Sequence, residues 1–367
     1  MKFEKYPSSE EKIEPRCFLL KRRGQALAWC SAEKKEISNP LLTWNSAQPV
    51  PMYSLLAQTI KKYKNEIGIT KKIYLDVLKT ENVLKALEES GRLDVVERSF
   101  DFVGTYSDVS DAQEIETLEF CPSDSENEEE FCWLRCAWLS VLESDRSLRF
   151  RFSHGMPDIE DVSLDLALQR KSSLLCDLIF PESKIITDSE EIVEVVANSL
   201  GVKRFEFLEK IVYFNAPDGG ALFHHDVERG HLGVIYAQIT GSTAWLALSS
   251  AQLLDCIKQY VSNSNNHDAL KADVGSEEIF IKLLGCTSEP EKIYSSLNER
   301  EEELEILINN SSSFTKYLID SGHGYLLEPG DVIFLPQFSV QECAWHSVFC
   351  VGEETGEALS FAIRASE

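Results

Sequence analysis

The sequence contains no run of ~18 apolar residues, the length that a membrane-spanning helix needs. Its first residues, MKFEKYPSSEEK, are charged and precede no apolar stretch, so they do not resemble a secretory signal. The ten cysteines form no CxxC pair, a pattern that favours reduced, mostly buried thiols over a disulfide framework. We therefore expect a globular, cytoplasmic protein with no membrane partner.

Basic residues are scarce: 36 Lys and Arg stand against 61 Asp and Glu, for a net charge of −25. Residues 1–75 have the opposite charge balance, with 14 basic and 7 acidic residues. The acidic bulk should repel a phosphate backbone, which argues against nucleic acid as a partner. The basic N-terminal part, which includes Lys21, Arg22 and Arg23, can either contact an acidic partner or dock on the acidic remainder.

The 367 residues are 43% hydrophobic, which is enough for a sizeable core, and no internal repeat is evident. Two short strands are expected within 17–31, and apolar spacing predicts amphipathic helices over 54–69 and 81–100. The acidic run SDSENEEE at 123–130 reads as an exposed loop. We divide the chain into a mixed α/β region, 1–120, packed on or beside the core, and a β-rich domain, 121–367.

Short apolar runs separated by turn signals fill the second part of the chain. A hairpin is expected over 131–155, a short helix over 187–201, and a series of strands from about 205 to 248 and from 324 to 365. Between them, about 249–321 is helix-forming and polar. The pattern predicts an α+β protein: a β-sandwich or barrel with a helical insert that covers the barrel mouth or serves as a brace or dimerisation element.

The segment FHHDVERGHL, 223–232, concentrates histidines and charges beside strand-like sequence. On a strand, alternate side chains share a face, so His224 and Asp226 point the same way. With His346, from AWHSV, they would form a two-histidine, one-carboxylate metal site that leaves positions open, as suits Fe(II) chemistry with O2. The HxD pattern alone is common by chance.

Other histidines fit that role less well. His225 has the wrong parity, and His231, at the start of the next strand, would pair with Asp226 only across a loop. The remaining ones lie in loop-like contexts and are expected at the surface or in caps: His154, His267 and His323. The CxxH spacing of Cys343 and His346 has no second such pair, which disfavours a structural zinc site.

Four segments carry a resemblance to a known family: VYFNAPDGGALFHHD, YAQITGSTAWLAL, LLEPGDVIFLP and AWHSV. Over about 205–365 they resemble the JmjC-type and cupin-like oxygenases, whose double-stranded β-helix, or jelly roll, carries HxD on one strand and a distal histidine near the other end. The resemblance implies a double-stranded β-helix and an Fe(II)- and 2-oxoglutarate-dependent dioxygenase that uses O2 to oxidise an unactivated C–H bond. It also implies that His224, Asp226 and His346 are the metal ligands.

The cosubstrate needs a cation for its far carboxylate, and an arginine fork answers a carboxylate with two hydrogen bonds. If the last two strands form a hairpin around Glu354, the residue opposite His346 is Ala362, whose same-face neighbours are Ala358, Ser360 and Arg364. Arg364 is therefore the predicted anchor, although a slip of one residue would exchange the two faces.

The sequence departs from the JmjC pattern at two places. Thr243 stands where that family commonly has a lysine anchor, and Ala221 stands where it typically has a threonine. These differences weaken a demethylase assignment and make an arginine on the last strand more necessary. Tyr213 on the preceding strand is a further candidate for the same carboxylate, so Arg364, Thr243 and Tyr213 form the predicted cosubstrate set; for Tyr213 a purely structural role in the core is equally compatible.

For the substrate we favour a small amino-acid-like metabolite, with hydroxylation, desaturation or cyclisation as outcomes, and a protein or peptide substrate as the alternative. A halogenase is disfavoured, because such enzymes generally lack the carboxylate ligand that Asp226 supplies. Three other classes stay open: a cupin-like metal-binding protein without oxygenase activity, a hydrolase or isomerase using zinc or manganese, and a pure interaction protein. The sequence does not indicate an oligomeric state.

Overall fold

The computed structural model describes residues 1–3, 17–110, 113–124, 132–138, 146–156, 159–162, 165–228, 230–288 and 290–366. Apart from 123–124, the acidic stretch expected as a loop lies outside these residues. Within the described part of the chain, no helix combines the length and apolar character needed to cross a membrane.

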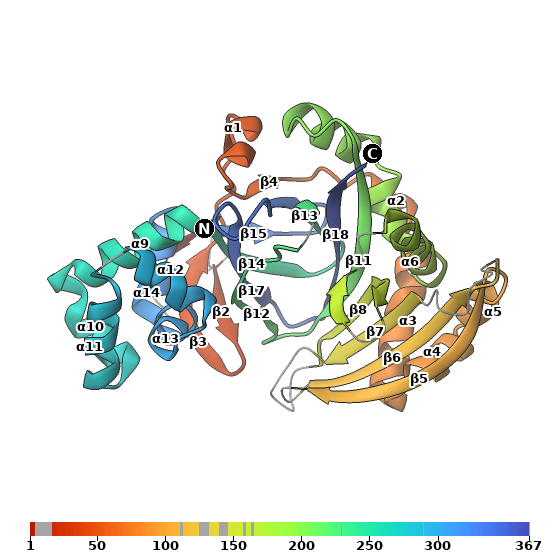
Figure 1. The fold of residues 1–367 in the computed structure, drawn as a ribbon, viewed down its shortest axis with the longest axis horizontal. Helices are drawn as coiled ribbons and strands as arrows, with labels where there is room; N and C mark the ends of the chain where they lie inside the picture. The colour runs from red at the N-terminus through yellow and green to blue at the C-terminus, as the bar shows by residue number, and fades with distance from the viewer. Residues whose placement is uncertain are drawn as a thin grey trace.

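Two antiparallel sheets face each other across the centre of the molecule (Figure 1). The larger follows the order β4-β16-β13-β18-β11-β8-β7-β6-β5 and the smaller the order β12-β17-β14-β15. Their strands are β4 (Val50–Met52), β5 (Phe100–Ser110), β6 (Gln113–Pro122), β7 (Cys132–Trp138), β8 (Leu148–Ser153), β11 (Phe205–Asn215), β12 (Gly220–His224), β13 (His231–Gln238), β14 (Ser242–Ser249), β15 (Gly324–Leu327), β16 (Val332–Pro336), β17 (Ala344–Val351) and β18 (Gly356–Ala365).

From β11 to β18 the chain passes repeatedly between the two sheets, which is the topology of a double-stranded β-helix. The predicted fold is thereby confirmed. The TGS turn between β13 and β14 shows why a glycine is needed there: Gly241 has φ 68°, and a Cβ on it would lie 2.6 Å from the Cα of Gly356.

The last two strands do not pair with each other. β17 pairs with β12 and β14 in the smaller sheet, whereas β18 pairs with β11 and β13 in the larger one. The hairpin around Glu354 was therefore a wrong prediction, because the link crosses from one sheet to the other. The predicted division of faces still holds: Ala358 packs in the cluster between the sheets, while Leu359 and Phe361 pack in the cluster outside.

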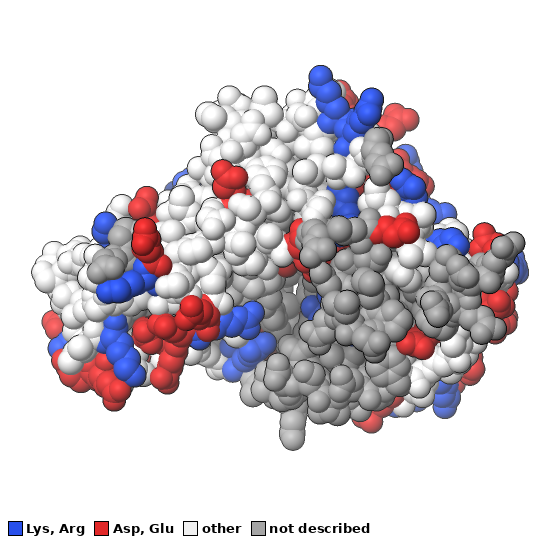
Figure 2. All heavy atoms as spheres, in the orientation of Figure 1, with Lys and Arg blue, Asp and Glu red and all other residues white. Residues whose placement is uncertain are grey.

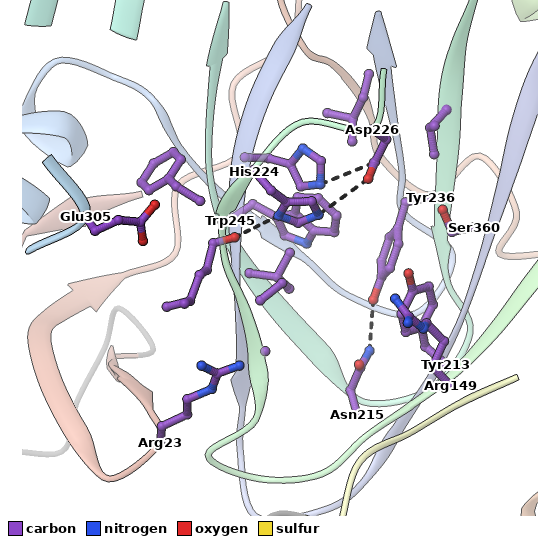
Figure 3. A pocket seen from close by; sticks show the side chains of 18 of the residues that line it. Arg23, Arg149, Tyr213, Asn215, His224, Asp226, Tyr236, Trp245, Glu305 and Ser360 are labelled. Carbon is purple, nitrogen blue, oxygen red and sulfur yellow. Dashed lines mark hydrogen bonds and ion pairs between the residues drawn. The ribbon is translucent and has the colours of Figure 1, made fainter. Parts of the chain in front are cut away.

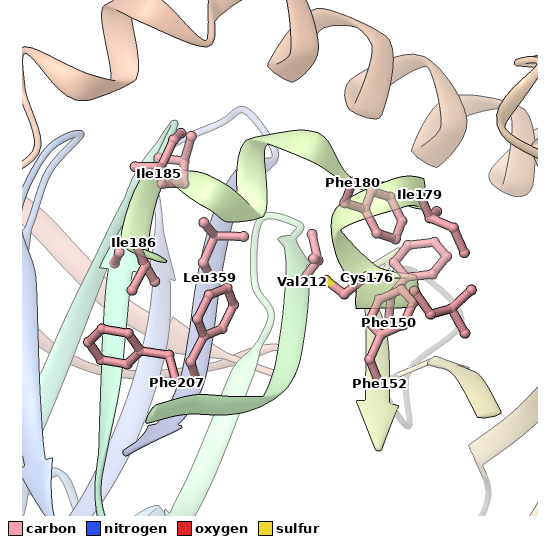
Figure 4. Packing of buried hydrophobic residues seen from close by; sticks show 14 of the residues in the cluster. Phe150, Phe152, Cys176, Ile179, Phe180, Ile185, Ile186, Phe207, Val212 and Leu359 are labelled. Atoms are coloured by element: carbon pink, nitrogen blue, oxygen red, sulfur yellow. The ribbon is translucent and has the colours of Figure 1, made fainter. Parts of the chain in front are cut away.

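Helices from two parts of the chain cover the outer face of the larger sheet. Figure 4 shows Ile179 and Phe180 beside Phe150, and Cys176 next to Val212. The helices on this side, besides α1 (Pro40–Asn45), which packs beside β4 and β16, are α2 (Thr59–Lys62), α3 (Lys64–Thr80), α4 (Val83–Glu89), α5 (Arg92–Val96), α6 (Leu166–Ile179), η1 (Pro181–Ser183), α7 (Lys184–Thr187), α8 (Glu190–Glu194) and the π-helix η2 (Val195–Ser199). The expected helices at 54–69, 81–100 and 187–201 are thus confirmed in outline.

Residue 120 falls inside β6, and β5 to β8 continue the larger sheet without a break. The outer cluster also joins residues of α3 and α4 to residues of β11 and β18. Among the described residues, the N-terminal helices and the barrel therefore share one core across the boundary that we predicted at 120.

A small sheet of the N-terminal residues lies beside the smaller barrel sheet. It has the order β1-β3-β2, with β1 (Lys2–Phe3), β2 (Cys17–Arg22) and β3 (Gln25–Ser31). On the face drawn in Figure 2, basic side chains gather over β2 and β3, and acidic side chains gather over the neighbouring insert. Lys21 pairs with Asp218 at 3.2 Å and Lys34 with Asp331 at 2.7 Å, so this basic segment docks on acidic residues of the remainder.

The stretch between β14 and β15 is helical, as predicted. A capping box starts it: the Ser249 hydroxyl accepts from the Gln252 N–H, and the Gln252 side chain accepts from the Ser249 N–H. Its helices are α9 (Ser250–Ser262), η3 (Ser264–Asn266), α10 (His267–Val274), α11 (Glu277–Cys286), α12 (Pro290–Asn298), α13 (Glu302–Asn310) and α14 (Ser312–Asp320). They pack with β2 and β3 on the outer side of the smaller sheet. A remaining two-stranded sheet pairs β9 (Gly155–Met156) with β10 (Ile159–Val162).

Candidate metal centre and its cavity

Two imidazoles and one carboxylate converge between the sheets (Figure 3). His224, the last residue of β12, is the cross-strand partner of His346 in β17, and their ring centroids are 4.2 Å apart. Asp226 reaches both: its carboxylate oxygens lie 3.4 Å from His224 Nε2 and 3.5 Å from His346 Nε2. One ligand atom from each residue lies within 4.8 Å of the others, which is a spacing that one metal ion can bridge.

Strand alternation is not what brings Asp226 to this point. β12 ends at His224, and Asp226 lies in the loop that follows. The alternation pattern correctly predicted that Asp226 lies near His224, but for a partly wrong reason. The loop after β12, rather than a continuing strand, directs the carboxylate towards the two imidazoles.

Backbone carbonyls orient both imidazoles. His224 Nδ1 lies 2.7 Å from Leu222 O, and His346 Nδ1 lies 3.4 Å from Ala344 O. With Nδ1 protonated and donating to a carbonyl, each Nε2 keeps its lone pair for a metal. Trp245 stacks on His346, with centroids 5.4 Å apart and planes 27° apart, which fixes the ring further.

The electrostatics keep the carboxylate charged. Burial alone would raise the pKa of Asp226, but the adjacent His346 and His224 outweigh it and lower the pKa well below its usual range. Burial, reinforced by His224, lowers the pKa of His346 to about 4 despite the opposing effect of Asp226. The site thus presents one anion and, at His346, a neutral imidazole at neutral pH, which are the protonation states that metal coordination needs.

The site opens into a cavity of about 320 Å³. Part of its wall is apolar, and another part carries hydroxyl, amide and guanidinium groups. The apolar wall consists of Ala221, Leu222, Phe223, Val234, Trp245, Leu335 and Val348, and the polar wall of Arg149, Tyr213, Asn215, Tyr236 and Ser360. Three charged residues from outside the barrel complete it: Arg23 of the β2–β3 turn, and Arg300 and Glu305 of the insert.

Tyr213 lies in the cavity wall, where the sequence placed it. Its cross-strand partner on β8 is Arg149, which acts on the Tyr213 hydroxyl as a hydrogen-bonding neighbour, although burial outweighs this and raises the pKa of Tyr213. Next to them, Asn215 donates to the Tyr236 hydroxyl at 3.0 Å. The deep polar end of the cavity therefore has one guanidinium, that of Arg149, among hydroxyl and amide groups.

Arg149 was missed by the sequence reasoning, although a signal was present. In LRFRFS the apolar Leu148, Phe150 and Phe152 pack in the outer core, so the alternating arginines must face inward. An arginine that faces the interior of a barrel needs a partner or a ligand, and this inference could have been made from the alternation alone.

Arg364 lies elsewhere. It is 2% exposed, its Nε is 2.6 Å from Glu209 Oε1, and it is not among the described residues that line the cavity. Glu209 also binds His231, with 2.7 Å between Oε2 and Nε2. The guanidinium of Arg364 is thus already matched by a buried carboxylate, which argues against the prediction that it anchors the cosubstrate.

Thr243 also lies outside the cavity lining. Its hydroxyl donates to Gln238 Oε1 at 2.7 Å and accepts from Trp245 Nε1 at 2.9 Å. Gln238 Oε1 in turn accepts from the Tyr236 hydroxyl at 3.3 Å. Thr243 therefore supports two cavity-lining rings, those of Trp245 and Tyr236, and this position argues against the prediction that it contacts the cosubstrate.

The rival histidines have other roles. His225 packs edge-on against Trp345 at 5.0 Å between centroids, and His231 belongs to a second cluster with Glu209 and Glu228, which Arg364 and Arg151 neutralise. His267 Nε2 lies 2.9 Å from Val261 O at the end of α9, as expected for a cap. His154 is only 6% exposed, so its expected surface position was wrong.

Comparisons with known proteins give structural matches only. No family model and no curated protein sequence matches the chain. Among solved structures, the chain is similar to the ribosomal oxygenase YcfD of Escherichia coli in complex with cobalt and 2-oxoglutarate, with 13% identity over 76% of this chain and a TM-score of 0.24. It is also similar to an oxidoreductase of the 2OG-Fe(II) oxygenase family from Burkholderia pseudomallei, with 7% identity over 91% of this chain and 93% of that one, and a TM-score of 0.30. The match spans 44% of the length of YcfD.

Proposed function

We propose that this protein is an Fe(II)- and 2-oxoglutarate-dependent oxygenase. The observation that carries the proposal is the convergence of His224, Asp226 and His346, two imidazoles and one carboxylate, at the wall of an internal cavity. This donor set fits Fe(II), because the described residues offer three ligands on one side and leave the cavity side free. When bound, Fe(II) with 2-oxoglutarate and O2 supplies the oxidation of an unactivated C–H bond, while 2-oxoglutarate is converted to succinate and carbon dioxide.

Arg149 and Tyr213 are the proposed holders of the far carboxylate of 2-oxoglutarate. A guanidinium beside a phenol gives a carboxylate one charged and one neutral donor, and the low-dielectric wall strengthens both. Asn215 and Tyr236 lie next to them and keep each other fixed through their 3.0 Å hydrogen bond. This assignment replaces Arg364 and keeps Tyr213.

The apolar wall has a separate role. Val234, Leu335 and Val348 line the cavity near the ligands and exclude water, and the ring of Trp245 holds His346 in orientation. A dry, shaped cavity lets the protein hold a target carbon at the metal while it shields the reacting groups from solvent.

For the substrate we infer a small amino-acid-like molecule. Arg23 and Glu305 line the cavity from opposite segments outside the barrel, and Figure 3 shows them on the side away from Tyr213. The Nε of Arg23 is buried and has no hydrogen-bond partner among the described residues. A guanidinium and a carboxylate at one end of a cavity match the carboxylate and amino groups of a zwitterion, and the volume of about 320 Å³ suits a small molecule.

The test starts from protein prepared without oxygen and loaded with Fe(II). We expect 2-oxoglutarate to bind only with metal present, and succinate to form in a reaction that a substrate accelerates. His224→Ala and His346→Ala should abolish both, whereas His267→Ala, a matched change at a helix cap, should not.

Absence of 2-oxoglutarate binding with a full metal site would refute the oxygenase and leave a metal-binding cupin-like protein, or a zinc or manganese hydrolase or isomerase. Acceleration by peptides but by no free amino-acid derivative would refute the small-molecule substrate and favour a protein or peptide hydroxylase.

A further inference from the structure

The strand that carries His224 contains a β-bulge. Ala221 pairs with Val348 and His224 pairs with His346, so β12 has one residue more than β17 between the two pairs. In a regular ladder His224 would be out of register with His346, and a shift of one residue turns a side chain to the opposite face. The alignment of the two imidazoles therefore depends on this bulge.

A bulge leaves backbone groups without ladder partners, and here side chains supply the partners. Ala221 O accepts from an Arg22 guanidinium nitrogen at 2.6 Å and from Ser347 Oγ at 3.1 Å. The N–H of Phe223 donates to Asn309 Oδ1 at 2.8 Å. Buried peptide groups are costly to leave unpaired, so these contacts decide whether the bulged form is stable.

Arg22 and Asn309 come from segments outside the barrel. Arg22 ends β2, is 4% exposed, lies 4.6 Å over the ring of Phe349, and donates to Asn309 O at 3.3 Å. Asn309 belongs to α13 of the insert and is 3% exposed. Burial, together with the adjacent Arg23, lowers the pKa of Arg22 to about 9, so the guanidinium is still charged at neutral pH.

We propose that Arg22 and Asn309 are positioning residues that hold the bulge of β12 and thereby set His224 opposite His346. The inference rests on the proposed function, because it concerns the same metal ligands, but its structural part can be measured without metal. The β2–β3 hairpin and the helical insert then share one role, because each supplies one side chain that satisfies one of the backbone groups released by the bulge.

The experiment compares three variants of the full chain. Arg22→Met removes the donor fork, Asn309→Leu removes the acceptor with little change in shape, and Arg170→Met is the control. Arg170 also makes a bidentate contact, because its Nε and Nη2 each donate to a carboxylate oxygen of Glu206 at 2.6 Å, but this pair is exposed. Two quantities are measured: affinity and visible spectrum for Co(II), and hydrogen exchange of the amides of 220–226 without metal.

We expect Arg22→Met and Asn309→Leu to weaken Co(II) binding about tenfold to a hundredfold, as changes behind metal ligands do. The Co(II) spectrum should change, and exchange at 220–226 should quicken, most of all at the Phe223 amide in Asn309→Leu. Arg22→Lys, which keeps the charge but not the fork, should recover part of the affinity. Arg170→Met should match the wild type in all of these.

Unchanged exchange at 220–226 in both Arg22→Met and Asn309→Leu would overturn the proposal. So would wild-type Co(II) affinity and spectrum in those variants. If the wild type itself bound no Co(II), the proposed function would fail, and the exchange data alone would decide the bulge contacts. If Arg22→Met did not fold, Arg22→Lys and Asn309→Leu would decide the outcome in the same two measurements.

Discussion

At the scale of single residues, Arg149 and Arg364 show how the surroundings of two arginines on the same sheet give them different roles. Both lie on strands of the larger sheet that flank β11, but Glu209 neutralises Arg364 at 2.6 Å, whereas Arg149 lies in the cavity wall beside Tyr213. The charge of Arg364 is already balanced by a buried carboxylate, so the two arginines should differ in their effect on 2-oxoglutarate.

Arg149→Met should raise the KM for 2-oxoglutarate by about tenfold to a hundredfold, because a hydrogen bond to a charged group contributes about 1.5–3 kcal/mol. Arg364→Met should instead lower the thermal midpoint, because it leaves Glu209 buried with one partner fewer, and should leave that KM near the wild-type value. Steady-state succinate formation at varied 2-oxoglutarate, with calorimetry of each variant, measures both. A larger KM effect from Arg364→Met would restore the original assignment.

Arg23→Met should impair only the substrate side of the reaction. Because Arg23 lines the outer part of the cavity, the variant should lose substrate-stimulated succinate formation at least tenfold for a substrate that carries a carboxylate. Its slow, substrate-independent turnover of 2-oxoglutarate should persist, since Arg149 and the three metal ligands are untouched. A rise in the KM for 2-oxoglutarate in Arg23→Met would mean that Arg23, and not Arg149, binds the cosubstrate.

Much of the candidate site was predictable at this scale, and the limits have physical causes. His224, Asp226 and His346 could be named because few residue types bind metals and their neighbours follow strand patterns. The pairing of Arg364 with Glu209 could not be foreseen, because Glu209 lies on a strand whose pairing with β18 cannot be read from either segment alone. Arg23 could not be foreseen in the site, because only the docking of a distant hairpin brings it there.

At the scale of elements, local patterns predicted strands and helices well and their pairing less well. The alternation in EALSFAIRA separated the inner from the outer face of β18 correctly, because alternation is a property of the strand itself. The predicted partner of β18 was wrong, because the short connection between β17 and β18 is equally compatible with a hairpin and with a crossing between sheets. The capped insert was found because its cap and its helical spacing are both local signals.

A buried pair of carboxyl groups links η1 to the start of β18. Glu182 and Glu357 are 0% and 2% exposed, and they lie close enough for the charge of Glu182 to act on Glu357. Burial raises the pKa of Glu182 to about 8, and it raises that of Glu357 well above its usual value. Between pH ~4.5, the usual value for an unfolded glutamate, and pH 8 the folded state holds more protons than the unfolded state, so stability falls as pH rises through this window.

Glu182→Gln should therefore stabilise the protein, and by more at pH 8 than at pH 5. We expect a gain of about 2 kcal/mol at pH 8 and a small effect at pH 5, because glutamine replaces the protonated form without a charge to bury. Denaturant unfolding at several pH values measures this gain, with Glu88→Gln on an exposed position of α4 as the control. A gain that is the same at both pH values would contradict the assignment.

At the scale of the whole molecule, one core joins segments that the sequence had divided. Ile73 of α3 is fully buried in the cluster that also contains Phe214 and Ile363. Contacts of this kind couple the N-terminal helices to the barrel, so the chain should not unfold in two parts.

Ile73→Ala should lower the free energy of unfolding by about 3 kcal/mol and should do so in a single transition. Tryptophan fluorescence and far-UV circular dichroism, followed together through a denaturant titration, should give coincident curves for the wild type and the variant. Two separated transitions, with only the first one shifted by Ile73→Ala, would instead support a boundary near residue 120.

The pairing of His224 with His346 also bears on when an iron site can exist. The strand that holds His224 is synthesised before the helical insert, and its partner strand only after it. A growing chain thus carries two of the three proposed ligands before the third has been synthesised. The complete proposed ligand set can form only after β17 has been added next to β12.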